Sequence, residues 1–189
     1  MNIPTLLKRD YMQTVIMIAV VIIAVLVFWF GLSFIFRTDH PVLAVASGSM
    51  EPVLYAGDLI VIEGIPDIND IYAAPVSANP PGDIVVYQGT RELIVHRVIE
   101  KTIANNGVTT FTFHGDANPI GANEQVNEAR IVGRYVGFKI PWLGHIALFF
   151  DPPERKIAFI GLWVIILLVV ELIPEIRKKL KNGNNEPSL

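Results

Sequence analysis

The residues from Thr14 to Phe36 most constrain how this chain can fold, because this long apolar stretch contains no charged side chain. A helix needs about 20 apolar residues to cross a hydrocarbon core that is roughly 30 Å thick. The segment 14–36 therefore predicts a transmembrane helix. A removable secretory signal is the competing interpretation, but its apolar region would be only about 7 to 15 residues long and would end in small side chains. The residues Phe34, Ile35 and Phe36 do not fit that ending, so an uncleaved anchor is predicted.

A second apolar segment runs from Ile157 to Ile173 and carries Glu171 near its end. Its length is at the short limit for crossing a bilayer. We predict a second transmembrane helix at 156–174, and the alternative is an interfacial or buried helix.

Basic residues lie outside both apolar segments, on the side away from the region between them. They are Lys8 and Arg9 before the first segment, and Arg177, Lys178, Lys179 and Lys181 after the second. Positively charged flanks are typical of cytoplasmic loops. We therefore predict a multi-pass membrane protein whose termini, 1–13 and 175–189, are cytoplasmic. The intervening domain, 37–155, is then extracytoplasmic.

The charge of the chain is concentrated in this intervening domain. Residues 37–155 contain 8 Lys and Arg against 14 Asp and Glu, net −6, whereas 1–36 carry +1 and 156–189 carry +2, which together give the net charge of −3. An acidic domain has no electrostatic attraction for phosphate backbones, so nucleic-acid binding is not expected. The chain has no cysteine, which excludes disulfides and thiol catalysis. Its four histidines lack metal-ligand spacing, and no metal or other cofactor is predicted.

Short β-rich runs separated by Gly, Pro and Asn turns predominate between the apolar segments. The expected strands lie within Val53–Gly64, Asp83–Gln88, Glu92–Glu100, Val108–His114 and Ile131–Phe138, and the proline-rich Ile65–Gly82 is expected to be an irregular connection. There is no room for crossover helices between these strands. The pattern therefore predicts a mainly β fold, an antiparallel or barrel-like domain between two membrane helices.

The segment Ser47–Pro52 places a candidate serine nucleophile shortly after the first apolar segment. A serine hydroxyl is a weak nucleophile until a neighbouring base removes its proton. His96 is the most notable candidate base, because it interrupts an apolar strand where a polar ring is costly without a hydrogen-bond partner. A structural histidine is the simpler interpretation of His96 when the strand is considered alone.

Several ordered motifs together resemble the type I signal peptidase family. They are Ser47–Pro52, Gly57-Asp58, Gly82-Asp83-Ile84-Val85, Ile94-Val95-His96-Arg97-Val98 and Gly115-Asp116-Ala117-Asn118. The bacterial branch has a lysine base where this chain has His96, so the chain is similar to the archaeal and endoplasmic-reticulum branch. The resemblance implies a signal-peptidase-like β domain and a membrane-bound serine endopeptidase. The enzyme would remove amino-terminal signal peptides from exported preproteins, cutting after small residues.

The resemblance also implies roles for individual residues. Ser49 would be the nucleophile and His96 the base, and the hydroxyl of Ser47 would help the Ser49 N–H to bind the oxyanion. Asp116 matches the family's Gly-Asp motif and would orient His96 or support the strands. The second acidic residue that this branch usually carries a few positions later is missing, and Glu124 is the nearest substitute. Three alternatives therefore stay open for a triad with Ser49 and His96: Asp116 completes it, Glu124 completes it, or neither does.

The resemblance further implies that the chain acts on preprotein signal peptides in a lipid bilayer, alongside the protein translocation machinery. The bilayer would be a cell membrane, or the endoplasmic-reticulum membrane in a eukaryote. Two other functions stay open. One is a peptidase of the same fold dedicated to a few preproteins, and the other is a catalytically inert membrane-anchored β scaffold of the secretion machinery. For the side chains near the motifs, we expect His114 to be a structural strand-end residue and Met50 to pack in apolar surroundings.

Overall fold

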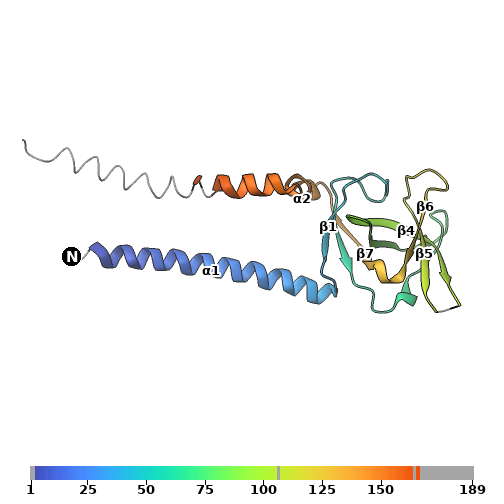
Figure 1. The fold of residues 1–189 in the computed structure, drawn as a ribbon, viewed down its shortest axis with the longest axis horizontal. Coiled ribbons are helices and arrows are strands. Elements are labelled where there is room, and N and C mark those ends of the chain that lie inside the picture. Colours follow the sequence, from blue (N-terminus) through green and yellow to red (C-terminus); the bar gives the residue numbers. More distant parts are fainter. Residues whose placement is uncertain (1–2, 106, 164, 167–189) are drawn as a thin grey trace, which may run out of the picture. The chain divides into compact units, whose positions relative to one another are not determined.

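The computed structural model describes residues 3–105, 107–163 and 165–166 (Figure 1). The chain divides after Gly144 into two units. The first unit contains the long helix α1 (Ile3–Phe36) and all the strands. The helix α2 (Gly144–Phe150) begins at the end of the first unit, and residues 153–163 and 165–166 of the second unit are also helical.

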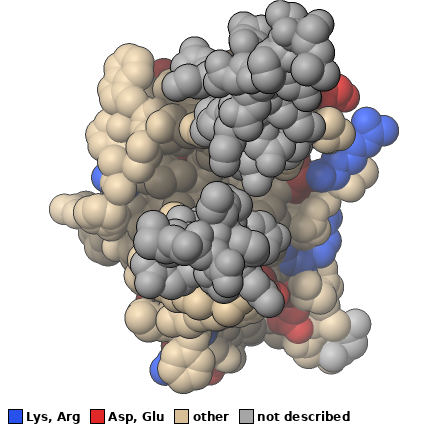
Figure 2. All heavy atoms as spheres, turned by 90° about the vertical axis from the view of Figure 1, so that its left-hand side faces the viewer, with Lys and Arg blue, Asp and Glu red and all other residues tan. Residues whose placement is uncertain are grey.

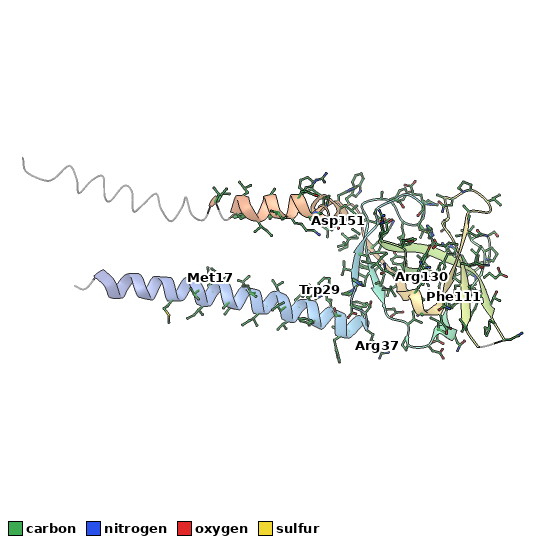
Figure 3. All side chains as sticks on the ribbon, viewed as in Figure 1. Met17, Trp29, Arg37, Phe111, Arg130 and Asp151 are labelled. Atoms are coloured by element: carbon green, nitrogen blue, oxygen red, sulfur yellow. The ribbon has the colours of Figure 1, made fainter. Side chains whose placement is uncertain are left out.

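Within the described residues, α1 is the one helix long and apolar enough to cross a membrane, with its apolar window at Val15–Phe36. None of that window is buried by the rest of the protein. Met17 and Trp29, which Figure 3 labels on this helix, are 62% and 43% exposed. A core helix of a soluble protein would be covered, so such continuous apolar exposure fits the predicted membrane anchor. Among the described residues visible in Figure 2, most side chains are uncharged, and the Lys, Arg, Asp and Glu side chains lie mainly on the right-hand side of the view.

The end of α1 is capped and joined to the β domain through its backbone. Arg37 adopts a left-handed conformation (φ 54°), and the Thr38 N–H bonds the Ser33 carbonyl at 3.2 Å. These two features form a Schellman cap, which terminates the helix. The Gly64 N–H bonds the Phe36 carbonyl at 2.7 Å, so the last residue of the helix is held against the end of a strand.

Seven antiparallel strands form one sheet in the order β1-β2-β7-β3-β4-β5-β6 (Figure 1). Their bounds are β1 (Val42–Ala44), β2 (Leu59–Glu63), β3 (Ile84–Gln88), β4 (Leu93–Ile103), β5 (Thr109–His114), β6 (Asn123–Asn127) and β7 (Ile131–Ile140). The predicted mainly antiparallel β fold is confirmed. All five predicted strands are present, whereas β1 and β6 were not predicted.

The strand β3 contributes to two hydrophobic clusters because both of its faces are buried. Ile84 and Val86 belong to one cluster, which also contains Met50 and Leu54. Alternate residues of a strand point to opposite faces, so Val85 and Tyr87 belong to the other cluster, together with Val98, Phe111, Phe113 and Val126. β3 is therefore the shared wall between the two halves of the core.

The remaining expectations concern the connection before β3 and the second apolar segment. Residues 65–82 are irregular, as predicted, except for a short 3-10 helix at Ile68–Asp70. The described part of the predicted span at 156–174 is helical, whereas residues 164 and 167–174 lie outside the described residues. The basic tail at 175–189 also lies outside them.

Candidate active site

Ser49 lies in the loop that follows β1, and the residues next to it fix its position. Met50 and Leu54 are fully buried in the core, which confirms the predicted packing role of Met50. The Glu51 N–H bonds the Gly48 carbonyl at 3.1 Å, and the Leu54 N–H bonds the Met50 carbonyl at 2.9 Å. Because these turns fold around an anchored Met50, the Ser49 side chain is held at the surface of the domain while the next side chain points inward.

A second loop, at Gly115–Asn118, holds the Ser49 backbone from the other side. The Ala117 N–H donates to the Ser49 carbonyl oxygen at 2.9 Å. A Cβ atom at position 115 would lie only 2.7 Å from the same oxygen, a distance that real Cβ atoms essentially never show. Glycine at position 115 therefore permits the close approach of the two loops.

His96 reaches Ser49 from strand β4. Its Nε2 atom lies 3.1 Å from the Ser49 Oγ atom, within hydrogen-bond distance. The register between β3 and β4 pairs His96 with Val85, and directly paired residues of antiparallel strands share a face of the sheet. His96 consequently lies on the same face as Val85 and Tyr87, where its ring is only partly exposed.

The other nitrogen of His96 faces a residue that was not singled out from the sequence. The Tyr87 hydroxyl lies 3.3 Å from His96 Nδ1 and donates to Glu124 Oε2 at 2.8 Å. Glu124 is paired with Phe113, and Phe113 packs on Tyr87 with ring centroids 4.4 Å apart. Glu124 and Tyr87 start from strands that are three positions apart in the sheet, about 14 Å in a flat sheet. Their hydrogen bond therefore requires the sheet to curl around this face.

The carboxylate of Asp116 is bonded to Arg97 rather than to His96. The Arg97 Nε atom donates to Asp116 Oδ1 at 2.8 Å and its Nη2 atom to Oδ2 at 2.5 Å. The two side chains are 5% and 2% exposed. Arg97 also donates from Nη1 to the Gly82 carbonyl at 2.6 Å. These bonds link β4, the loop after β5 and the residues before β3, and they correspond to the strand-supporting alternative for Asp116.

Burial and neighbouring charges together set the proton affinity of His96. Burial lowers its pKa below the ordinary value, and the charge of His114 lowers it further. The charges of Glu124 and Asp116 act in the opposite direction, but the net shift is downward. A histidine with a lowered pKa is neutral near pH 7 and can accept a proton. Burial, assisted by Glu124, holds the pKa of Tyr87 above its ordinary range, so its hydroxyl stays protonated.

Ser47 and His114 are the other predicted residues near this pair. The Ser47 hydroxyl is exposed and lies 3.4 Å from the Ser49 Oγ atom. His114 ends β5, as predicted, and its Nδ1 atom lies 3.0 Å from Asn123 Oδ1. Within the described ranges, no group of three or more His, Asp or Glu side chains is arranged to hold a metal ion.

A groove of about 350 Å³ is lined by both Ser49 and His96. One wall is β1 with the residues leading to Ser49, and the other is the start of β4, Leu93–His96. Leu93–His96 pair with β3, whereas the register with β5 begins at Arg97. The floor includes the apolar side chains of Ile60 and Val86. An extended peptide in this groove would lie next to the Ser49 hydroxyl and the His96 ring.

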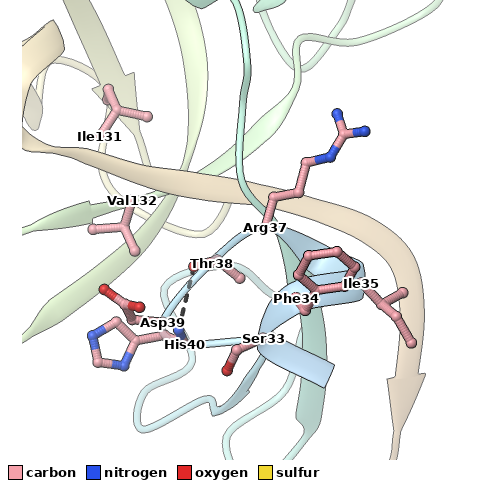
Figure 4. A pocket seen from close by; sticks show the side chains of 9 residues that line it. All are labelled: Ser33, Phe34, Ile35, Arg37, Thr38, Asp39, His40, Ile131 and Val132. Atoms are coloured by element: carbon pink, nitrogen blue, oxygen red, sulfur yellow. Dashed lines mark hydrogen bonds between the residues drawn. The ribbon is translucent and has the colours of Figure 1, made fainter. Parts of the chain in front are cut away.

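A separate hollow of about 800 Å³ lies where α1 meets the β domain (Figure 4). Its lining includes Phe34, Arg37 and His40 from the helix end and the residues after it, and Ile131 and Val132 from β7. Although it is larger than the groove, it contains neither Ser49 nor His96. The groove, not this hollow, is therefore the candidate active site.

No family model matches the chain, but individual proteins do. The signal peptidase complex catalytic subunit SEC11C of Rattus norvegicus is 30% identical over 164 residues, which are 82% of this chain and 80% of that protein. The catalytic subunit SEC11 of Lachancea thermotolerans is 33% identical over 152 residues, 75% and 83% of the two chains. That of Tuber melanosporum is 27% identical over 172 residues, 85% and 91% of the two chains.

Proposed function

The chain belongs to the family of signal peptidase catalytic subunits, and we propose that it is a serine endopeptidase that removes signal peptides from preproteins with Ser49 and His96. The observation that carries this assignment is the 3.1 Å approach of His96 Nε2 to Ser49 Oγ. These side chains come from segments 47 residues apart, and both line the same groove.

The reaction uses the geometry of this pair directly. His96 Nε2 accepts the hydroxyl proton as Ser49 Oγ attacks the scissile carbonyl carbon, which forms a tetrahedral oxyanion. As the carbon–nitrogen bond breaks, His96 returns the proton to the leaving amine. His96 then deprotonates a water molecule as it attacks the Ser49 ester, and returns that proton to Ser49 Oγ as the ester bond breaks and the signal peptide leaves with a new carboxyl terminus.

The oxyanion is stabilised by donors that surround the nucleophile. In this proposal they are the Ser49 N–H and the hydroxyl of Ser47. The Ser47 hydroxyl lies 3.4 Å from Ser49 Oγ in the free enzyme, and a rotation about its side-chain bond would aim it at the oxygen of a bound substrate. Asp116 contributes at a distance, because its ion pair with Arg97 braces the loop whose Ala117 N–H holds the Ser49 carbonyl.

The groove favours an extended substrate with small side chains next to the cut bond. The edge strand β1 and the start of β4 offer backbone groups for strand addition. Apolar side chains, including Ile60 and Val86, line this groove together with Ser49. Small apolar side chains fit such a space better than large or charged ones.

The membrane places the enzyme and its substrate together. α1 anchors the catalytic domain, and the apolar part of the signal peptide occupies the same bilayer while its cleavage site enters the groove. In the full proposal the segment 156–174 is a second span, the domain 37–155 is extracytoplasmic and the translocation machinery delivers the preprotein. The membrane is a cell membrane, or that of the endoplasmic reticulum in a eukaryote.

Cleavage of a preprotein by the purified full chain in liposomes tests this function. Wild type, Ser49→Ala and a matched control at an exposed serine, Ser77→Ala, would be compared, and the new amino terminus would be sequenced. We expect cleavage after a small residue by wild type and Ser77→Ala only. Equal cleavage by Ser49→Ala would remove Ser49 from the mechanism. Unrelated preproteins in the same assay distinguish a general enzyme from a dedicated one, and absence of all cleavage would favour the inert scaffold.

A further inference from the structure

We infer that Tyr87 and Glu124 together orient His96, with the Tyr87 hydroxyl as a bridge between the Glu124 carboxylate and the His96 ring. Tyr87 and Glu124 are then positioning residues, because they act on the substrate only through His96. The inference rests on the proposed function, since it concerns how the base of that reaction is prepared.

The available protons allow one arrangement when Glu124 is ionised. An ionised carboxylate only accepts hydrogen bonds, so the single hydroxyl proton of Tyr87 points to Glu124. The Tyr87 oxygen can then only accept at its contact with His96, and the neutral His96 ring must carry its proton on Nδ1. The lone pair on Nε2 is consequently left facing Ser49 Oγ, 3.1 Å away. This is the tautomer that a general base requires.

The same contacts stabilise the charge that forms during the reaction. When Nε2 takes the Ser49 proton, the ring becomes an imidazolium with N–H groups on both nitrogens. The Nδ1–H group stays bonded to the Tyr87 oxygen, and the Tyr87 proton stays bonded to Glu124. No proton moves beyond His96, since the raised pKa of Tyr87 keeps its hydroxyl intact. The negative carboxylate therefore stabilises the imidazolium through a polarised hydroxyl.

Asp116, the other acid that could orient His96, is already paired with Arg97. The effect of Glu124 on kcat depends on how exposed its carboxylate is. Asp116 has both carboxylate oxygens bonded to Arg97. Glu124 is 44% exposed, and its other oxygen lies 3.9 Å from Arg130, so water and a cation weaken its influence. We therefore expect Glu124→Gln to lower kcat about 3- to 10-fold. Loss of the bridge in Tyr87→Phe leaves Nδ1–H without this acceptor and should lower kcat about 10- to 100-fold.

Steady-state cleavage by the full chain in liposomes gives the first test. Tyr87→Phe keeps the ring that packs on Phe113, and Glu124→Gln keeps an acceptor for the Tyr87 hydroxyl, so both variants should fold. If the two residues act as one unit, the double variant should be within about 2-fold of Tyr87→Phe alone. The matched controls are Tyr72→Phe and Glu100→Gln, which should be within 2-fold of wild type. Losses that multiply in the double variant would contradict a shared path to His96.

The His96 titration gives a readout that a purely structural role would not move. The ionisable groups facing the ring are Tyr87 from β3, His114 from β5, Asp116 from the following loop and Glu124 from β6. The Glu124 charge raises the pKa of His96, so Glu124→Gln should shift the acidic limb of kcat to lower pH. Glu100→Gln should leave that limb unchanged. An unshifted limb in Glu124→Gln would overturn the inference.

Nitrogen-15 NMR of the full chain in micelles tests the tautomer without requiring catalysis. The His96 signals would be identified by their loss in His96→Gln. We expect a neutral ring protonated on Nδ1 in the wild type. A proton on Nε2 would overturn the bridge even if the enzyme cleaves preproteins, whereas inactivity of the wild type with the expected tautomer would count only against the proposed function.

Discussion

Replacing Asp116 with alanine is expected to lower the free energy of unfolding of the β domain by about 3–5 kcal/mol. Arg97 and Asp116 form a two-pronged ion pair whose side chains are 5% and 2% exposed. In Asp116→Ala the Arg97 guanidinium would stay buried with the Gly82 carbonyl as its remaining acceptor among those described above. The cost is large because a buried charge loses its partner, not because the intact pair is strongly stabilising.

Pulse proteolysis of the full chain in micelles at increasing urea measures this free energy. For a domain of about 100 residues, a loss of 3–5 kcal/mol also corresponds to a fall in Tm of at least about 10 °C. The matched control is Asp70→Ala at an exposed position, which should change stability by less than about 0.5 kcal/mol. The double variant Arg97→Met with Asp116→Leu should regain most of the loss, since both charges are removed together.

Two results would refute this reasoning. A free energy of unfolding for Asp116→Ala within about 1 kcal/mol of the wild-type value would show that the ion pair is not needed for stability. A double variant as unstable as Asp116→Ala would show that the unpaired Arg97 charge is not the cause. If cleavage were lost while stability was kept, Asp116 would act locally on the site, either through its charge on His96 or through the loop whose Ala117 N–H holds the Ser49 carbonyl.

Three further predictions concern the reaction itself. Burial lowers the pKa of His96, so its neutral form is lost only as pH falls through that lowered pKa. The acidic midpoint of kcat/KM should therefore lie below about pH 6.5, and a midpoint above about 7 would contradict this prediction. Gly115→Ala should lower kcat at least about 100-fold, since the added Cβ would displace the Ser49 carbonyl. The control Gly31→Ala has open space around its Cβ and should keep its kcat. Cleavage assays measure the change in kcat, and crystallography would show the displaced carbonyl. Ser47→Ala should lower kcat about 10- to 100-fold with little change in KM, and a pure KM effect would place Ser47 in substrate binding instead.

The strands that the sequence predicted are rich in apolar or β-branched residues, whereas one of the two missed strands is very short and the other is polar. β1 has only three residues, Val42–Ala44, and is held by its pairing with β2. β6, Asn123–Asn127, is almost entirely polar and is held by five paired residues of β5. Tertiary pairing overrides weak propensity in both cases. The irregular course of 65–82 was predictable because its prolines cannot continue a strand ladder.

Some residues of the candidate site were predictable from the sequence, and others were not. The motifs drew attention to Ser49 and His96, which the fold brings within 3.1 Å, but Tyr87 looked like one more core residue at the end of an apolar run. A signal was available in the spacing: a hairpin closed around Gly89 and Glu92 pairs Val85 with His96 and Tyr87 with Ile94. That register makes Tyr87 a diagonal neighbour of His96. The contact with Glu124 was not predictable, because it depends on the curl of four strands.

Because both faces of β3 are buried, substrate selectivity and turnover are linked through this strand. Val86 lines the groove, and the next residue, Tyr87, contacts His96 from the opposite side of the same strand. An engineer who enlarges the groove by trimming Val86 would also loosen the backbone that carries Tyr87. Broader specificity at this position should therefore be accompanied by slower turnover, whereas changes at Leu43, on the β1 wall of the groove, should alter selectivity with less effect on rate.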